Sequence, residues 1–295
     1  MTQVTLPSGI ALEYETHGSP ADQPILMVMG FGTQLIGWPR AFCAHLAAPG
    51  RYVISFDNRD TGLSQKFADA PAPIEAIMSR VLAGDLDGAR ALAPYTLSDM
   101  AADAVGLLDA LGLERAHVLG ASMGGFIAQT MAIEHPGRLL SLTSMMSSTG
   151  EPEYGQAAPA SLDALLAPSP TEREAYIDSS SRWLAWHSHR YPEAEETRRL
   201  AAEAFDRGLC PEGTQRQLAA MLAGGSRAAA LAALALPTLV LHGLDDTLIA
   251  PSGGERTAEL IPGARLVLIA DMGHDRPRPL WDAICQPIWE ITACA

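Results

Sequence analysis

The feature that most limits the fold of this 295-residue chain is an alternation of short apolar runs with longer segments of helical periodicity. Short runs bounded by turn residues are typical of buried parallel strands. The expected strands are 12–16, 25–29, 52–56, 116–119, 139–146, 238–241 and 264–269. The expected helices are 38–48, 98–111, 123–134 and 281–292, with Ser98 as the N-cap and Gly112 as the stop of the second. Such alternation predicts an α/β fold in which helices cover both faces of a parallel sheet.

Two stretches interrupt this alternation. Residues 66–97 are rich in alanine and proline and lengthen one connection. Residues 150–235 contain no convincing strand and have a helical, aromatic-containing pattern. We interpret this segment as a helical cap, or lid, above the sheet, which leaves residues 1–149 and 236–295 as the α/β core. The alternative is that the segment only covers core surface.

Charge and composition exclude several kinds of partner. The formal net charge of −14 opposes binding to nucleic acid or to an anionic membrane surface. The longest apolar run, 228–241, contains Pro237 and is too short to cross a bilayer. The first residues lack the basic and apolar regions of a signal peptide, and the cysteines lack metal-ligand spacing. We therefore expect a cytoplasmic protein without a metal site.

One motif carries chemistry: Gly120-Ala121-Ser122-Met123-Gly124, between an expected strand and an expected helix. In a G-x-S-x-G turn the glycines let neighbouring backbone pass close, and the serine hydroxyl stands clear of the sheet. The helix dipole favours negative charge that develops at this position. We predict that Ser122 is a catalytic nucleophile; the alternative is a glycine-rich turn that serves packing.

A serine nucleophile needs a base, and the base needs an acid that orients it. His274 falls in the turn after the last expected strand, at the sheet edge where open α/β sheets bind ligands. Asp245 and Asp246 follow the strand 238–241 at the same edge. We predict His274 as the base and Asp246 as the acid, with Asp245 as the alternative. The chain order serine, aspartate, histidine is typical of this architecture.

Attack on a carbonyl creates an oxyanion, which two backbone N–H groups can stabilise. Met123, directly after the nucleophile, supplies one N–H group. The loop after the strand 25–29 supplies the other, because Gly30 and Gly32 let its backbone approach a substrate. We assign this second donor to Phe31.

Other histidines receive structural interpretations. His242 ends a strand, and His135 ends a helix as a cap. His187 and His189 lie in the cap segment, where we expect surface positions; contact with substrate is the alternative.

The turn after the strand 52–56 holds Asp57 and Arg59, which we expect to tie that turn by charge-assisted hydrogen bonds. Apolar side chains predict a hydrophobic substrate pocket. The candidate pocket residues are Trp38, Trp183, Trp186 and Met145. Core packing is the alternative for Trp38 and Met145.

Residues 3–148 and 236–293 together resemble the α/β-hydrolase superfamily. The resemblance implies an eight-stranded, mostly parallel, doubly wound sheet with the helical cap inserted after the sixth strand. It also implies that Ser122, Asp246 and His274 form a catalytic triad.

The stretches 29–38 and 56–62, followed by the serine turn, are similar to a subgroup of bacterial esterases. This subgroup includes methylesterases that act on polyketide antibiotics such as aclacinomycin. The chain has Met29-Gly30 where the wider family has His-Gly, and Arg59-Asp60 where it has Arg-Gly. Neither change removes a backbone donor.

These features predict a carboxylic-ester hydrolase (class EC 3.1.1) that acts on an apolar small-molecule ester through an acyl-enzyme and needs no cofactor. The same groups also serve lactone, amide or carbon–carbon bond hydrolysis, perhydrolysis and acyl transfer, which the sequence leaves open. A non-catalytic ligand-binding protein of the same fold is a distant alternative.

Overall fold

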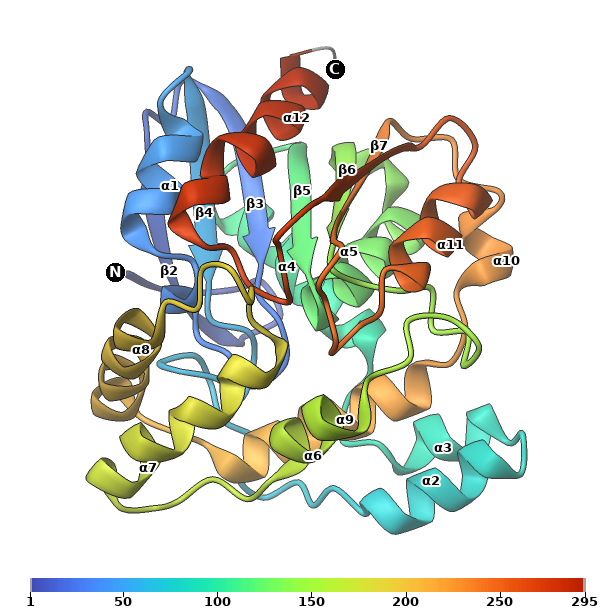
Figure 1. The fold of residues 1–295 in the computed structure, drawn as a ribbon. Helices are drawn as coiled ribbons and strands as arrows, with labels where there is room; N and C mark the ends of the chain where they lie inside the picture. The colour runs from blue at the N-terminus through green and yellow to red at the C-terminus, as the bar shows by residue number, and fades with distance from the viewer. Residues whose placement is uncertain (1, 294–295) are drawn as a thin grey trace.

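Eight strands form one sheet in the order β1-β2-β4-β3-β5-β6-β7-β8, in a computed structural model that describes residues 2–293 (Figure 1). Strand β2 is antiparallel to both of its neighbours, β1 and β4, and the other pairs are parallel. The strands are β1 (Thr2–Thr5), β2 (Ala11–His17), β3 (Gln23–Val28), β4 (Arg51–Phe56), β5 (Ala116–Ala121), β6 (Leu139–Met145), β7 (Thr238–Gly243) and β8 (Arg265–Ile269). The predicted α/β fold with a mostly parallel, eight-stranded sheet is therefore confirmed.

Strand β1 has no counterpart among the apolar runs of the sequence. Three of its four residues are exposed, and Val4 is only partly covered. The strand lies at the sheet edge and pairs with β2 alone, so backbone hydrogen bonds hold it rather than buried side chains. A search for apolar patterns does not find a strand of this kind.

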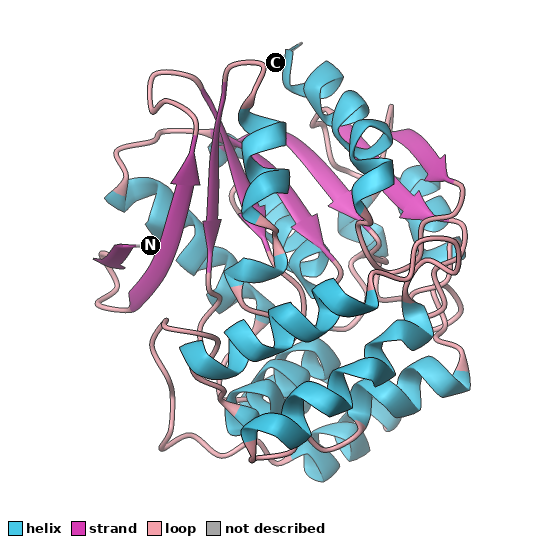
Figure 2. Cartoon of the chain, turned by 60° about the vertical axis from the view of Figure 1, so that its left-hand side comes forward, coloured by secondary structure: helices cyan, strands magenta, loops and turns pink. Residues whose placement is uncertain are grey.

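The central strands bury both of their faces, which explains their continuous apolar sequences. In β3, Ile25 and Met27 belong to one core cluster and Leu26 and Val28 to another, because successive side chains of a strand point to opposite faces. Figure 2 shows helices on both sides of the sheet. Helices α1 (Arg40–Ala47) and α12 (Trp281–Ala293) cover the first face, and α4 (Leu97–Ala110), α5 (Met123–Glu134) and α11 (Ser252–Leu260) cover the second.

Helix α4 begins one residue earlier than expected and uses a different cap. The Thr96 side chain accepts the Asp99 N–H, and the Asp99 carboxylate accepts the Thr96 N–H, which makes a capping box. Ser98, the predicted N-cap, donates instead to Glu134. The predicted stop at Gly112 is confirmed, since this residue has a φ of 69°.

Asp57 ties the turn after β4 as expected, but Arg59 does not. Asp57 accepts the N–H of Leu63 within the turn at 2.9 Å and that of Leu35 at 2.6 Å. The Arg59 guanidinium leaves the turn and forms a buried, bidentate ion pair with Asp103 of α4, at 2.7 and 2.8 Å. The long side chain of Arg59 therefore joins two elements rather than closing one turn.

Replacing Asp103 by alanine should lower the free energy of unfolding by about 3–5 kcal/mol, because the buried Arg59 guanidinium would lose its counter-charge. Urea denaturation followed by circular dichroism measures this loss. The matched control is Asp109→Ala on the same helix, which breaks a more exposed pair with Arg138 and should cost less than about 1 kcal/mol. Equal losses in the two variants would contradict the importance of the buried pair.

Two helices occupy residues 66–97, where the sequence indicated only a long connection. Helices α2 (Ile74–Leu82) and α3 (Leu86–Leu92) pack on α9 (Pro211–Gly224). The cluster that they share is small, with Ile77 as its only large, fully buried member beside three alanines. So small a cluster leaves little apolar periodicity in the sequence.

Helices, and no strand, fill the chain between β6 and β7, all of which the structure describes. They are α6 (Pro159–Leu166), α7 (Arg173–Ser179), the 3-10 helix η3 (Ser180–Trp186), α8 (Ala194–Arg207), α9 and α10 (Ala228–Leu231). Helices α6, α7 and α9 lie beyond the carboxyl ends of the parallel strands (Figure 1). The division of the chain into a core and a cap at residues 150 and 235 remains a prediction.

Charged side chains fix α8 and α9 to the turn after β4. Arg207, the last residue of α8, pairs with the buried Asp57 at 2.5 Å. Arg216 of α9 forms a buried, bidentate pair with Asp60 at 2.7 and 2.8 Å. Gln217 adds hydrogen bonds to the same turn. These contacts place two helices of the β6–β7 connection at a fixed distance from the sheet edge.

Candidate active site

Ser122 occupies a strained turn between β5 and α5. Its φ of 58° and ψ of −124° lie outside the regions that non-glycine residues favour. The Ser122 N–H donates to the Met145 carbonyl at 3.0 Å, and the Ser147 hydroxyl donates to the Ser122 carbonyl at 2.9 Å. Hydrogen bonds on both sides therefore hold the strained conformation.

The glycines around Ser122 allow backbone contacts that a side chain would block. A Cβ atom at Gly120 would lie 2.0 Å from the Gly124 carbonyl oxygen, and one at Gly124 would lie 2.1 Å from the Val28 carbonyl oxygen. At Gly30 the added atom would lie 3.1 Å from the Ser122 Cβ. These contacts pack α5 tightly against β3 and bring the loop after β3 next to the serine.

His274 and Asp246 are joined by a hydrogen bond of 2.7 Å between Nδ1 and Oδ2. The other carboxylate oxygen of Asp246 accepts the N–H groups of Leu248 and Ile249, both at 2.9 Å. His242 Nε2 lies 3.4 Å from Asp246 Oδ2 and 2.8 Å from the Ile249 carbonyl oxygen. His242 therefore helps to hold the Asp246 carboxylate in place. Burial alone would raise the pKa of Asp246, but the two histidines lower it to about 2.

The structure brings Asp246, and not the alternative Asp245, to His274. Asp245 is partly exposed, and its N–H donates to the Met272 carbonyl. The reason is backbone geometry, because the hydrogen bonds from Leu248 and Ile249 turn the Asp246 carboxylate inward.

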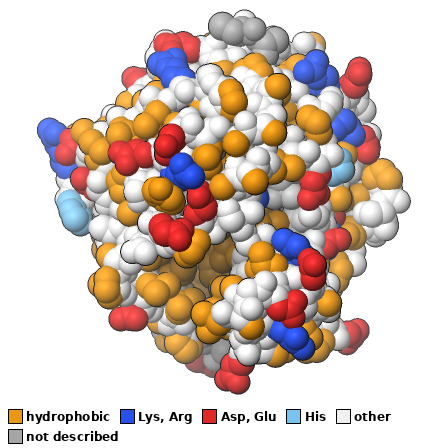
Figure 3. All heavy atoms as spheres, turned by 90° about the vertical axis from the view of Figure 1, so that its right-hand side faces the viewer, with side chains coloured by type: hydrophobic (Ala, Val, Ile, Leu, Met, Phe, Trp, Pro, Cys, Tyr) orange, Lys and Arg blue, Asp and Glu red, His pale blue; other side chains and the backbone are white. Residues whose placement is uncertain are grey.

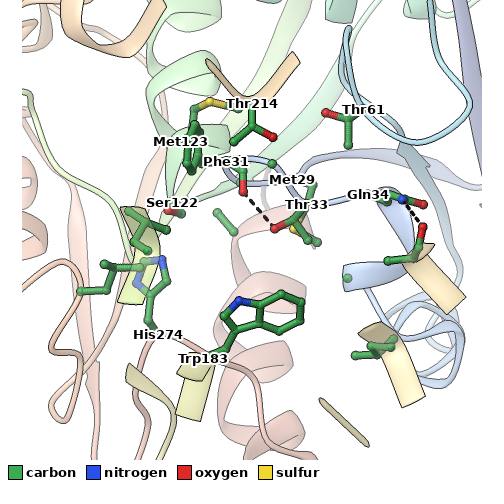
Figure 4. A pocket seen from close by; sticks show the side chains of 18 of the residues that line it. Met29, Phe31, Thr33, Gln34, Thr61, Ser122, Met123, Trp183, Thr214 and His274 are labelled. Atoms are coloured by element: carbon green, nitrogen blue, oxygen red, sulfur yellow. Dashed lines mark hydrogen bonds between the residues drawn. The ribbon is translucent and has the colours of Figure 1, made fainter. Parts of the chain in front are cut away.

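One cavity of about 480 Å³ gathers the predicted reacting groups. Ser122, His274, Phe31 and Met123 all line it, and Figure 4 shows the His274 imidazole turned toward Ser122. Met123 opens α5, where the first N–H groups of a helix lack intrahelical acceptors. On the face shown in Figure 3, hydrophobic side chains border a hollow in the lower half of the molecule, the half that holds α6, α7 and α9.

Two of the four predicted pocket residues line the cavity, and two do not. Trp183 and Trp186 contribute to the wall. Trp38 is 1% exposed and stacks on Phe42 in the core, with ring centroids 6.0 Å apart, so its assignment to the pocket is wrong. The assignment of Met145 to the pocket is also wrong, because its side chain lies in the core.

Met145 ends β6 with its side chain in the same core cluster as Trp38. The next residue, Met146, belongs to the same cluster, but its φ is 42° and its side chain also lines the cavity. Met29, Met123 and Met221 also line the wall. Successive side chains of a strand point to opposite faces of the sheet, so the register of β6 decides which methionine faces the cavity. The sequence does not give this register.

The two histidines of the predicted cap segment divide between surface and cavity. His189 is exposed, as expected, whereas His187 lines the cavity, so its assignment to the surface is wrong. Burial, with contributions from Arg276 and His274, lowers the pKa of His187 to about 4. His135 caps α5 as predicted.

The segment that carries His187 packs directly on the loop of the predicted base. The His274 N–H donates to the Trp186 carbonyl at 2.6 Å. A Cβ atom at Gly273 would lie 2.4 Å from the same carbonyl oxygen. Glycine at 273 therefore lets the two backbones touch, and its position directly before a predicted base was the signal in the sequence for such a contact.

Two findings concern ligands and membranes. Within residues 2–293, no three His, Cys, Asp or Glu side chains are placed to hold a metal ion together. Every helix in this range is too short or too polar to cross a membrane.

The structure combines a mostly parallel, eight-stranded sheet with a strained serine after β5 and an Asp–His pair after β7 and β8. This combination is typical of one class of proteins, the α/β hydrolases. This chain belongs to the α/β hydrolase fold family, whose pattern matches residues 23–275.

Two related enzymes and one solved structure are similar to nearly the whole chain. The rhodomycin D methylesterase DauP of Streptomyces sp. (strain C5) is 31% identical, over 96% of this chain and 97% of that enzyme. The rhodomycin D methylesterase DnrP of Streptomyces peucetius is also 31% identical, over 94% of each chain. The enol-lactonase from Burkholderia xenovorans LB400 has a TM-score of 0.74 at 24% identity, over 99% of this chain and 100% of that one, a likeness of fold alone. The predicted resemblance to a subgroup with methylesterases is confirmed.

Proposed function

We propose that this chain hydrolyses carboxylic esters through a covalent acyl-enzyme on Ser122. Its family and its methylesterase relatives make it a carboxylic-ester hydrolase. The proposal concerns the groups that carry out the reaction and their order of action.

In the first half-reaction, the Ser122 hydroxyl oxygen attacks the ester carbonyl carbon while His274 Nε2 takes the hydroxyl proton. Asp246 holds the proton on Nδ1, which leaves Nε2 free to accept, and its charge stabilises the imidazolium that forms. The carbonyl oxygen becomes an oxyanion and receives hydrogen bonds from the N–H groups of Phe31 and Met123. The imidazolium then protonates the departing alcohol, and the carbon–oxygen bond to the alcohol breaks.

In the second half-reaction, His274 takes a proton from water, and the resulting hydroxide attacks the acyl carbon. Collapse of the second tetrahedral intermediate breaks the bond to Ser122 and returns the proton to its oxygen. The products are the free acid and the alcohol, and no external cofactor enters the balance.

The observation that carries this proposal is the short hydrogen bond between His274 and the buried Asp246, in the same cavity as the strained Ser122. A histidine with only a structural role would need neither a buried acid on one ring nitrogen nor a cavity shared with a serine. The cavity wall supports a substrate with an apolar body, since it contains four methionines and two tryptophans. We extend the methyl ester chemistry of the two relatives to this chain on that basis. A cytoplasmic location remains a prediction.

A fluorophosphonate probe tests the assignment, because only an activated serine reacts with it. We expect one adduct per chain, located on Ser122 by peptide mass spectrometry, and a large loss of labelling in His274→Ala. His135→Ala is the control and should label like the native chain, since His135 only caps α5. Labelling of another serine, or none in the native chain, would contradict the proposal.

A further inference from the structure

Arg276 lines the cavity two residues after His274. Its guanidinium carbon lies 4.6 Å from the centre of the Trp38 ring. Nη2 donates to the Gly37 carbonyl at 2.7 Å, and Nη1 lies 4.0 Å from the Met146 sulfur. These contacts hold the guanidinium in one place at the wall, beside the predicted base.

Most of the hydrogen-bonding capacity of Arg276 is unused. A guanidinium has five N–H donors, and among residues 2–293 only one of those of Arg276 meets an oxygen. Nε is buried without any hydrogen-bond partner. Leaving a buried donor without a partner is unfavourable, and more so when the donor is charged, so the free Nε of Arg276 calls for an explanation.

Among the described residues no acid forms an ion pair with Arg276, although the neighbouring Asp275 carboxylate stabilises its charge without direct contact. The buried arginines 59, 207 and 216 each pair with an aspartate within 4.0 Å. Asp275 precedes Arg276 but accepts the N–H groups of Ser188 and Gly273 with its two oxygens. Burial lowers the pKa of Arg276 only to about 10, so the side chain stays charged at neutral pH.

Arg227 is a buried arginine outside the cavity that forms no ion pair within residues 2–293. Its Nε, Nη1 and Nη2 atoms each donate to an oxygen, those of Gln129, Gly225 and Ser148. The comparison shows that the free donors of Arg276 do not follow from burial alone. What distinguishes Arg276 is its place on the cavity wall.

A second unpartnered polar atom lies in the same part of the wall. His187 Nδ1 is buried, has no hydrogen-bond partner among residues 2–293, and lies 3.9 Å from Asp275 Oδ2. The acidic side chains that line the cavity have partners of their own. Asp60 pairs with Arg216, Glu196 pairs with Arg199, and Glu193 accepts the Arg278 N–H. The open capacity of this wall is therefore that of a cation, Arg276, and of one imidazole nitrogen, His187 Nδ1.

We propose that Arg276 binds a free carboxylate of the ester substrate, separate from the ester group that reacts, with His187 as an additional polar contact. This inference rests on the proposed function, since it places the carboxylate relative to an ester that reacts at Ser122. The substrate class is then a half-ester, in which one acid group is esterified and another is free. Arg276 determines specificity and takes no part in bond breaking.

Pairs of esters that differ only at the far end test this inference. Monomethyl adipate and methyl hexanoate have the same length, as do monomethyl glutarate and methyl pentanoate, but only the first of each pair carries a carboxylate. We expect the native chain to have a higher kcat/KM for the half-ester in at least one pair. In Arg276→Met this ratio should fall about 10- to 100-fold, mainly through KM, and Arg276→Lys should retain part of it. Because each variant is compared with itself, a general loss of activity cancels.

Arg182 provides the matched control: it also lines the cavity and its Nε is also buried without a partner among the described residues, but its Nη1 and Nη2 both donate, to Pro168 and Ser169, so its outer nitrogens are already engaged. Arg182→Met should leave the ratio unchanged. An unchanged ratio in Arg276→Met, or a native preference for the neutral ester in every pair, would overturn the inference.

Labelling by the fluorophosphonate probe separates this failure from a failure of the proposed function. If Ser122 labels but the ratio does not depend on Arg276, only the carboxylate subsite is wrong. If Ser122 does not label, the hydrolytic assignment itself is wrong. If Arg276→Met does not fold, the thermal stability of Ser122→Ala decides: monomethyl adipate should raise its melting temperature more than methyl hexanoate does, and equal shifts would refute the subsite.

Discussion

Ser122→Ala should lower kcat/KM for methyl and p-nitrophenyl esters by a factor on the order of 10⁵ to 10⁶ while leaving the fold intact. The loss is large because the hydroxyl oxygen forms the bond on which every later step depends. Stability should change little, since alanine at this turn has the same backbone strain as serine, and the hydrogen bonds that hold the turn use the backbone N–H and carbonyl of residue 122. Initial rates and a thermal melt of the same preparation measure the two effects.

Ser147→Ala is the matched control for that experiment. It removes one hydroxyl donor to the Ser122 carbonyl and no reacting group. We expect a loss of about 1 kcal/mol in stability and a far smaller effect on rate than Ser122→Ala. Turnover above about 1% of the native rate in Ser122→Ala would exclude Ser122 as the nucleophile.

Asp246→Asn should lower kcat by about 10³- to 10⁴-fold. The amide can present its NH₂ group to His274 Nδ1, which favours the tautomer with the proton on Nε2, and that nitrogen can then no longer accept the serine proton. Asp245→Asn is the matched control and should keep nearly native activity, since the hydrogen bond to His274 Nδ1 comes from Asp246. A large loss in Asp245→Asn with a small loss in Asp246→Asn would transfer the role of the acid to Asp245.

The pKa of Asp246 adds a dependence on pH. Because its pKa in the folded protein is lowered from 3.8 to about 2, the carboxylate stabilises the fold fully above about pH 4. This contribution is lost as the pH falls toward 2. In Asp246→Asn the corresponding part of the acid-induced loss should be absent from denaturation curves measured across that range.

The central strands and the serine turn could be predicted from the sequence because they depend on local rules. Burial on both faces makes β3 and β5 continuous apolar runs, and residues 120 and 124 must be glycine because a Cβ atom at either would lie only 2.0–2.1 Å from a backbone carbonyl oxygen. The turn residues that follow β7 and β8 place Asp246 and His274 at one edge by topology alone.

The features that could not be predicted depend on partners distant in the chain. Arg59 binds Asp103 rather than its own turn, and no local pattern shows which acid a long side chain reaches. Met146, and not the expected Met145, lines the cavity, because strand register and a positive φ at residue 146 decide which side chain faces it. The cavity position of Arg276 follows from the same kind of packing, since its contacts come from Gly37, Trp38 and Met146.

The two buried ion pairs that join α8 and α9 to the turn after β4 also constrain how molecules enter and leave. Lifting either helix would separate buried opposite charges, at a cost of about 3–5 kcal/mol for each pair. Helix α7 packs on α8 through Tyr176 and Phe205, whose ring centroids lie 5.7 Å apart, and its ion pairs with α8, Arg173 with Asp206 and Asp178 with Arg198, face solvent and contribute little. Movement of α7 separates no such buried pair, so we expect the ester, the alcohol and the acid to enter and leave beside α7, while the pairs of Arg207 and Arg216 keep α8 and α9 in place.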